Sequence, residues 1–250
     1  MSTLSAHSLG GLPEVRAGDD VAELVTAALE TKRLDGQIVA IAHKIVSKAE
    51  GAVVSLADVT PTPRAQALAA EQSKDPSAVQ VVLDQSEEVI RAANGVLICR
   101  THHGFTCANA GVDASNAPDK DTLITLPRDP DASARRIRAR LQVLTGAAPA
   151  VLITDSFGRA WRHGQCDVAI GCAGLSPLED WRGRIDSAGL ELRATWLAVA
   201  DAIAATADLA RAKDSHEPVV IVSGLERFVT AADGPGARAL LRPVAEDLFR

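Results

Sequence analysis

The chain has 250 residues, 47% of them hydrophobic and 23% charged, which is the size and composition of a globular protein with a full hydrophobic core. The formal net charge of -6 argues against a protein that binds nucleic acid through its phosphates, because such binding needs a basic surface. The apolar runs, for example 148–153, are too short to span a bilayer, and no secretory signal precedes them, so we expect a cytoplasmic protein with no nucleic-acid partner and no membrane contact.

Short helices and strands are predicted in the first half of the chain. Apolar runs rich in β-branched residues indicate buried strands, Ala-rich runs indicate helices, and an aspartate before a helix indicates its cap. The predicted elements are a helix over 20–32 capped by Asp19 or Asp20, a strand over 37–42, a turn that carries Ser47 and Lys48, a helix over 64–74, and strands over 79–83 and 96–101.

The second half adds longer helices to further strands. The predicted elements are a strand over 123–126, a stop over 127–130, a basic amphipathic helix over 132–145, strands over 150–154 and 168–174, an Ala-rich helix over 190–213, a strand over 219–222 and a terminal helix from about Gly236. The order is mixed rather than regularly alternating, so the sequence predicts an α+β fold, with residues 1–250 forming a single domain.

A polar segment rich in Gly, Asn and Ala follows the strand predicted over 96–101. Within it, Asp113 and Asn116 lie three positions apart, so one turn could direct a carboxylate and an amide at the same ligand. Carboxylate oxygens suit Mg²⁺ or Mn²⁺, which in turn hold phosphate oxygens. The alternative is an Asx-turn that caps the next element, and spacing alone favours this alternative.

The strand predicted over 150–154 leads into Asp155 and Ser156, with Gly158 behind them. Many nucleotide enzymes hold a metal ion with an aspartate at the end of a strand, although such an aspartate can also simply cap a turn. Because two separate segments each carry a suitable aspartate, a metal site is favoured more than by either segment alone.

Positively charged side chains flank these segments. Arg159 and Arg162 could hold an anionic substrate, since a guanidinium group matches carboxylate and phosphate geometry, but Asp167 could instead neutralise one of them. Lys44 and Lys48 could add positive charge near phosphates, and solvated lysines are the alternative. Glycines at 104, 111, 158, 164 and 171 are typical of loops in which the backbone approaches a ligand.

Common nucleotide and metal motifs are absent from the sequence. There is no GxxxxGK[ST], no dinucleotide fingerprint and no HExxH. A nucleotide, if one binds, therefore uses a site without a P-loop.

Two long segments resemble signatures of the coenzyme F420-0:L-glutamate ligases, also called gamma-glutamyl ligases. These segments are 107–116 and 155–171, and the shorter stretches 11–14, 44–51 and 218–224 occur in the order typical of that family. The resemblance covers nearly the whole chain. It implies a mixed α/β ligase fold, an intertwined homodimer, and ligation of L-glutamate to coenzyme F420-0 through an acyl phosphate made with GTP.

The same resemblance implies roles for individual residues. Two divalent ions, Mg²⁺ or Mn²⁺, would be held by Asp113, Asp155 and Ser156, with K⁺ as a further candidate cation, and the catalytic residues would be Asp113, Asp155 and Lys48. The implied GTP contacts are Gly11, Leu12, Pro13, Glu14, His43, Lys48 and Asn116. Placing Arg159 and Arg162 on the coenzyme is our own inference.

The sequence also departs from the family pattern. His43 stands where a small hydroxyl residue is usual, Cys166 replaces a usual Thr, and Arg211 lies where Met-Gly usually precedes a nucleotide-binding loop. We expect no C-terminal nitroreductase-like domain. The alternatives are a relative that ligates a different amine or acid, a metal-dependent phosphohydrolase, and a nucleotide-binding regulator without activity.

Overall fold

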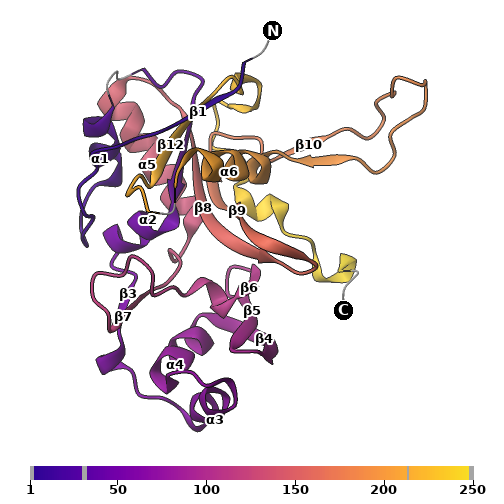
Figure 1. Ribbon diagram of the computed structural model, residues 1–250. Helices are drawn as coiled ribbons and strands as arrows, with labels where there is room; N and C mark the ends of the chain where they lie inside the picture. The colour runs from indigo at the N-terminus through magenta and orange to yellow at the C-terminus, as the bar shows by residue number, and fades with distance from the viewer. Residues whose placement is uncertain (1–2, 30–32, 213, 248–250) are drawn as a thin grey trace.

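A five-stranded sheet forms the centre of the computed structural model, which describes residues 3–29, 33–212 and 214–247 (Figure 1). The strand order is β1-β12-β2-β8-β9, and among these strands only β2 and β8 run parallel. The strand bounds are β1 (Ser5–Ser8), β2 (Ile38–Ala42), β8 (Ala150–Arg159), β9 (Arg162–Ala173) and β12 (Val219–Ser223). With the surrounding helices, this sheet confirms the predicted mixed α+β class.

The inner strands are apolar on both faces, because both faces of the sheet are covered by helices. In β2, Val39 and Ile41 belong to one hydrophobic cluster, whereas Ile38 and Ala40 belong to another. The alternation follows from the two-residue period of a strand.

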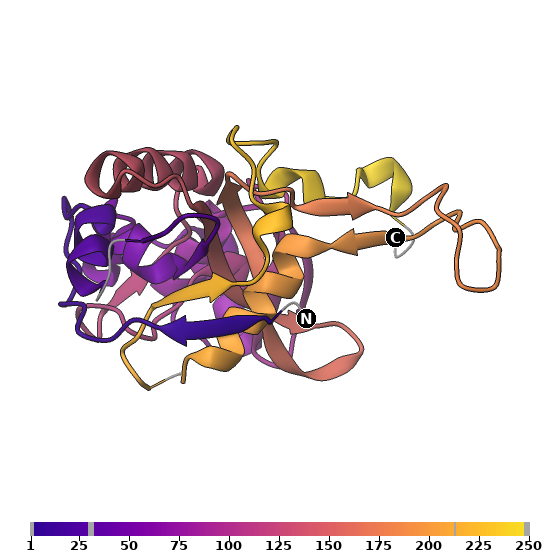
Figure 2. The ribbon, with the colours of Figure 1, turned by 90° about the horizontal axis from the view of Figure 1, so that it is seen from above.

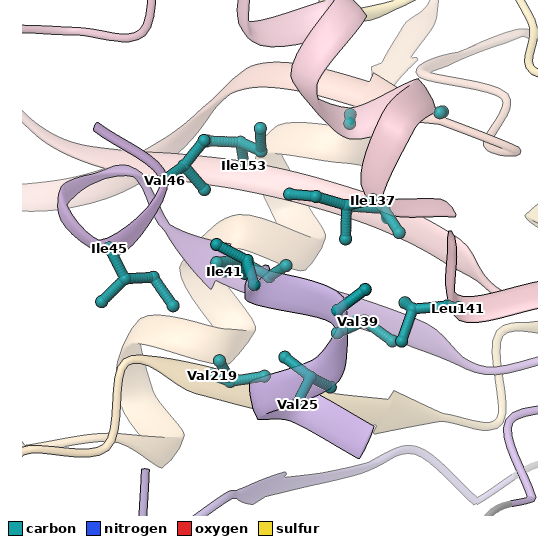
Figure 3. Packing of buried hydrophobic residues seen from close by; sticks show 14 of the residues in the cluster. Val25, Val39, Ile41, Ile45, Val46, Ile137, Leu141, Ile153 and Val219 are labelled. Carbon is teal, nitrogen blue, oxygen red and sulfur yellow. The ribbon is translucent and has the colours of Figure 1, made fainter. Parts of the chain in front are cut away.

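The first cluster packs the sheet against three helices, α1 (Val21–Ala28), α2 (His43–Ala49) and α5 (Pro130–Thr145). Figure 3 shows side chains of all three helices meeting those of the sheet. Asp20 caps α1 by accepting hydrogen bonds from the backbone of Ala22 and Glu23, as predicted. The second cluster packs the opposite face against α6 (Val199–Ala210) (Figure 2).

A smaller unit lies below the sheet in Figure 1 and has its own hydrophobic cluster. Its elements are α3 (Pro63–Gln72), α4 (Pro76–Asp84), and the sheet of β4 (Ser86–Ala93), β5 (Val96–Thr101) and β6 (Thr106–Ala108). The short pair of β3 (Val53–Ser55) and β7 (Thr122–Ile124) lies at its two connections to the main body. The 3-10 turns here are η1 (Leu56–Asp58) and η2 (Asn109–Gly111).

A hairpin arm projects from the body between β9 and α6 (Figure 1). It is built on the antiparallel pair β10 (Leu178–Asp180) and β11 (Trp196–Ala198). The chain ends with three 3-10 turns, η3 (Glu226–Phe228), η4 (Ala237–Leu240) and η5 (Val244–Glu246).

Four predictions about the elements are wrong. Residues 79–83 lie in α4 rather than in a strand, because Asp75 caps that helix and Pro76 begins it, and these signals outweigh the β-branched run. The helix predicted over 190–213 begins only at Val199, because 196–198 pairs with β10. Lys48 lies in α2, not in a turn, and short 3-10 turns replace the helix expected from Gly236.

The predicted ends of two helices, at 30–32 and 213, fall outside the described residues. Within the described parts of the chain, no helix is both long and apolar enough to cross a membrane.

Candidate functional site

A cavity of about 360 Å³ opens at the carboxyl ends of the parallel strands β2 and β8. Ligands of α/β sheets commonly bind at this edge, where loops after neighbouring strands meet. The wall is formed by residues 12–15, 42–45, 48, 116, 154–156, 167, 211, 212 and 216–218. Five parts of the chain that are distant in sequence therefore contribute to one site: residues 12–15, the end of β2 with α2, Asn116, the β8–β9 hairpin, and residues between 211 and 218.

His43 and Asp155 face each other in this cavity. His43 is 2% exposed, and its Nε2 lies 3.3 Å from Asp155 Oδ1, while its Nδ1 lies 3.2 Å from Ser47 Oγ. Nε2 makes no hydrogen bond with good geometry to the described residues, so the short distance to Asp155 is an ion-pair contact only when the imidazole is protonated. A buried polar atom that faces a cavity without a partner is suited to contact a ligand there.

Asp155 does not end its strand as predicted, since β8 continues to Arg159 in a hairpin with β9. The prediction is correct in one respect, because the pairing of β8 with β2 stops at Thr154. Beyond that point the Asp155 carboxylate lies at the cavity wall, where its Oδ1 accepts a hydrogen bond of 2.8 Å from the Ser156 backbone.

Asp113 lies close to the cavity and is paired with Lys44, the neighbour of His43. Lys44 Nζ is 2.7 Å from Asp113 Oδ2, and the Ser115 backbone and hydroxyl donate hydrogen bonds of 2.7 and 2.8 Å to the same carboxylate. Burial acts to raise the pKa of Asp113, but the bonds from Lys44 and Ser115 outweigh it and hold this pKa below its usual value. Asp113 therefore stays ionised at neutral pH.

The 113–116 turn has the contact of an Asx-turn, and its ligand-binding interpretation stays a prediction. The backbone hydrogen bond from Ser115 to Asp113 is the contact of an Asx-turn, the alternative that spacing favoured. Asn116 adopts a left-handed backbone conformation with φ of 57° and lines the cavity, as a ligand-binding residue would.

Lys48 is buried, with 6% of its surface exposed, so the alternative of a solvated lysine is wrong. Its ammonium group pairs with Glu14, and both residues line the cavity. Leu12 and Pro13 also line it, whereas Gly11 does not.

The inner wall contains a charged group that the sequence did not predict as a site. Asp167 accepts hydrogen bonds of 2.8 Å from Thr154 Oγ1 and 2.6 Å from Ser156 Oγ, and it pairs with Arg211. We had considered Asp167 as an ion-pair partner of Arg159 or Arg162, but the arginine beside it comes from the end of α6. No spacing in the sequence could have revealed a pair 44 positions apart.

Arg159 and Arg162 do not line the cavity. Both lie exposed at the tip of the β8–β9 hairpin, where Arg159 donates a hydrogen bond of 2.6 Å to the carbonyl of His163. In the structure these two residues are therefore separated from the other predicted site residues.

The cysteine that opens the 107–116 segment is not a nucleophile. Cys107 is buried, and burial, with a smaller contribution from the Asp155 charge, raises its thiol pKa to about 12. The thiol therefore stays protonated at neutral pH, and the chemistry of the site depends on its charged groups.

A metal ion would have to be held here by few protein groups. In the described part of the chain, no three His, Cys, Asp or Glu side chains are grouped so that they could hold a metal. This arrangement differs from a structural metal site, but Mg²⁺ is commonly bound through one or two carboxylates plus substrate phosphates. The isolated carboxylate of Asp155 beside the Ser156 hydroxyl fits that second type of site.

Comparison with known proteins gives consistent matches. A family model described as F420-0:Gamma-glutamyl ligase matches residues 11–224. The coenzyme F420:L-glutamate ligase of Methanothermobacter thermautotrophicus is 45% identical over 251 residues, which cover 99% of each chain. Proteins of the same name from Methanopyrus kandleri and Halobacterium salinarum are 43% and 41% identical, over 97% and 96% of this chain and 100% and 97% of their own.

Proposed function

The chain belongs to the F420-0:gamma-glutamyl ligase family, and from this membership and the geometry of the cavity we propose that it joins L-glutamate to coenzyme F420-0 at the expense of GTP. The relatives' names support the ligase activity and the two substrates. The dependence on GTP and on a divalent metal is our proposal: the resemblance in sequence implies it, and the charged residues of the cavity are compatible with it.

The observation that carries the proposal is the concentration of charge in one cavity without a P-loop. Lys48, His43 and Arg211 lie in its wall together with Asp155 and Asp167. Phosphoryl transfer requires mainly positioning and neutralisation of charge, and this wall offers both signs of charge. GTP phosphates would contact 12–14, His43, Lys48 and Asn116.

Mg²⁺ or Mn²⁺ would bind through Asp155 and Ser156, with Asp113 as a further carboxylate. When bound, such an ion would neutralise phosphate charge and align the reacting oxygens. For Asp113 to serve as a ligand, Lys44 has to give up its ion pair, because that carboxylate is already neutralised.

The reaction would proceed in two steps. A terminal carboxylate oxygen of coenzyme F420-0 attacks the γ-phosphorus of GTP, which forms an acyl phosphate and releases GDP. The neutral amine of glutamate then attacks the acyl carbon, the amide bond forms, and phosphate leaves with the electron pair of the broken C–O bond and takes up the proton that the nitrogen loses. Lys48 would hold negative charge that develops on phosphate oxygens.

We also propose that the active form is a homodimer. The hairpin arm supports this proposal, because its apolar residues Ile185 and Leu190 are 64% and 67% exposed. Exposed apolar groups on an element that projects from the body are typical of a surface that another chain covers.

Omission experiments separate the proposal from its alternatives. The purified protein, with Mg²⁺, should release phosphate from GTP only when coenzyme F420-0 and glutamate are both present. Release without any amine would favour a phosphohydrolase, and tight GTP binding without turnover would favour a regulator. Turnover with another amine but not with glutamate would indicate a relative with a different substrate.

The two aspartates give a test at the level of residues. Asp155→Asn and Asp113→Asn should each lower metal-dependent turnover on the order of 10²-fold or more, because each removes a carboxylate that would hold the metal ion against the reacting phosphates. Circular dichroism should show an intact fold in both variants. Asp119→Asn, which alters an exposed acid in the same loop, should keep full activity. Full activity in both test variants would contradict the metal assignment.

A further inference from the structure

Arg211 has an unusual position for an arginine, because its guanidinium group is buried in the cavity wall. Its side chain is 8% exposed, and that of its partner Asp167 is 3% exposed. Nη2 donates a hydrogen bond of 2.7 Å to Thr154 Oγ1, and Nη1 donates one of 3.1 Å to the carbonyl of Pro218. The group thus joins the end of α6 to β8, β9 and the start of β12.

The atoms around this guanidinium would also suit a metal ion. They are a carboxylate oxygen of Asp167, the hydroxyl of Thr154 and a backbone carbonyl, and these are the hard oxygen donors that bind Mg²⁺ or Mn²⁺. Ser156, whose hydroxyl donates to the other Asp167 oxygen at 2.6 Å, connects this group of oxygens to Asp155. A positive charge is therefore held next to Ser156, one of the three residues that the resemblance implies as ligands of two ions.

The ion pairs of the other carboxylates in the cavity wall indicate which of them could bind an added cation. Glu14 is paired with Lys48, as Asp167 is with Arg211. Asp155 has no lysine or arginine of the described residues at ion-pair distance, and its nearest polar neighbours are His43 Nε2 and the Ser156 backbone. Glu217, the fourth carboxylate of the wall, accepts a hydrogen bond of 2.6 Å from Ser8 Oγ and likewise has no lysine or arginine of the described residues at ion-pair distance. Of these two, Asp155 is the one that adjoins Ser156 and the Asp167 group, so it is the carboxylate available for an added cation there.

We propose that Arg211 takes the place of one of the two divalent ions predicted for this cavity. Its guanidinium neutralises Asp167 permanently, so that the protein binds a single divalent ion, at Asp155. The inference extends the proposed metal chemistry, and it rests on the proposed function only for the Asp155 site.

Counting bound Mn²⁺ tests the proposal without nucleotide, coenzyme or amine. Free Mn²⁺ is measured by its electron paramagnetic resonance signal during titration of the full-length protein. Arg211→Ala should bind one equivalent more than the wild type, because the oxygens around Asp167 then accept the ion. The double variant Arg211→Ala with Asp167→Asn should return to the wild-type number. Arg140→Ala is the matched control, because it removes an arginine from two surface carboxylates, Asp20 and Glu23.

Thermal melting covers the case in which Arg211→Ala is too unstable to titrate. An ion that binds only the folded state stabilises it, so Mn²⁺ should raise the melting temperature of Arg211→Ala by more than that of the wild type. Equal Mn²⁺ numbers and equal shifts in both proteins would overturn the proposal, as would an extra site that survives in the double variant or appears in Arg140→Ala.

The proposed function and this inference can fail separately. If the wild type binds no Mn²⁺ and Arg211→Ala binds one equivalent, the inference on Arg211 holds, and an Asp155 site that binds the ion without substrate phosphates is wrong. If Asp155→Asn loses the wild-type site and Arg211→Ala gains none, the Asp155 site holds and the inference on Arg211 is wrong.

Discussion

At the scale of single residues, an ion pair beside the cavity keeps the Asp113 carboxylate ionised. Burial acts to raise the pKa of Asp113, but Lys44 and Ser115 hold this pKa below its usual value. A carboxyl whose pKa is lower in the folded than in the unfolded state stabilises the fold above the unfolded-state pKa. This stabilisation is lost as the pH falls through the folded-state pKa.

Lys44→Met should therefore raise the pKa of Asp113 towards its ordinary value of about 3.9. The wild type should lose the contribution of Asp113 to stability below about pH 4, and the variant should show little of this dependence. Carbon-13 NMR titration of the Asp113 side-chain carboxyl measures the shift directly. Lys120→Met, which removes an exposed lysine nearby in sequence, should leave this pKa unchanged. An equal pKa in wild type and Lys44→Met would show that the pair does not govern Asp113.

Much of the candidate site could be predicted at this scale, because most of its residues lie within short sequence motifs. Asp155, Ser156, Asn116, Lys48 and His43 all lie in the wall of one cavity. The Asp167–Arg211 pair could not be predicted, since it depends on how β9 and the end of α6 meet in space. Arg159 and Arg162 illustrate the opposite case, because their closeness to the motif in sequence does not bring them to the cavity.

At the scale of elements, the packing of α5 against β9 depends on a close approach of two backbones. A Cβ atom on Gly171 would lie 2.4 Å from the carbonyl carbon and oxygen of Pro130, the first residue of α5. Gly171 lies in a strand, as predicted for 168–174, and not in a loop near a ligand, the other interpretation of this glycine; its missing side chain leaves room for α5.

Gly171→Ala should destabilise the protein by about 1–3 kcal/mol, the usual range for overpacking a filled interior. Gly158→Ala is the matched control, since its Cβ would meet no atom within 4 Å and it lies in the same hairpin. Urea unfolding followed by tryptophan fluorescence gives the free energies of unfolding. Equal values for both variants would mean that the contact with Pro130 is relieved without cost.

The elements that could be predicted are those with strong local signals. The strands β2, β5, β8, β9 and β12 are apolar runs, and α1, α3 and α5 have clear periodicity or caps. The strands that were missed are β1, β3, β4, β6, β10 and β11, all of them short or partly polar. Of these, β1 and β3 depend on partners far away in the chain, whereas β4 and β6 each pair with the neighbouring strand β5. Pairing of this kind overrides local propensity, as it does where β11 replaces the start of the predicted helix.

At the scale of the whole molecule, the hairpin arm projects away from the body, and the body does not cover its outer part (Figure 1). Its Trp196 stacks beneath Arg182, with the guanidinium carbon 4.4 Å from the ring centre, while Ile185 and Leu190 remain exposed. In the proposed homodimer these apolar residues lie against the second copy.

Ile185→Ser combined with Leu190→Ser should therefore weaken the dimer by at least tenfold in dissociation constant, because two apolar side chains lose their burial. Sedimentation equilibrium measures the constant. Leu209→Ser, which alters a residue 90% exposed on α6, should leave it unchanged. A monomeric wild type, or an arm variant that dimerises as well as the wild type, would contradict this part of the proposal.

The most direct test of the central claim is the mass of the product. Purified protein is incubated with coenzyme F420-0, L-glutamate, GTP and Mg²⁺, and the coenzyme is then analysed by mass spectrometry. We predict that its mass increases by whole glutamyl residues, with one GDP formed for each residue added, and that Asp155→Asn gives no such product. A coenzyme of unchanged mass after GTP has been consumed would contradict the proposed ligase.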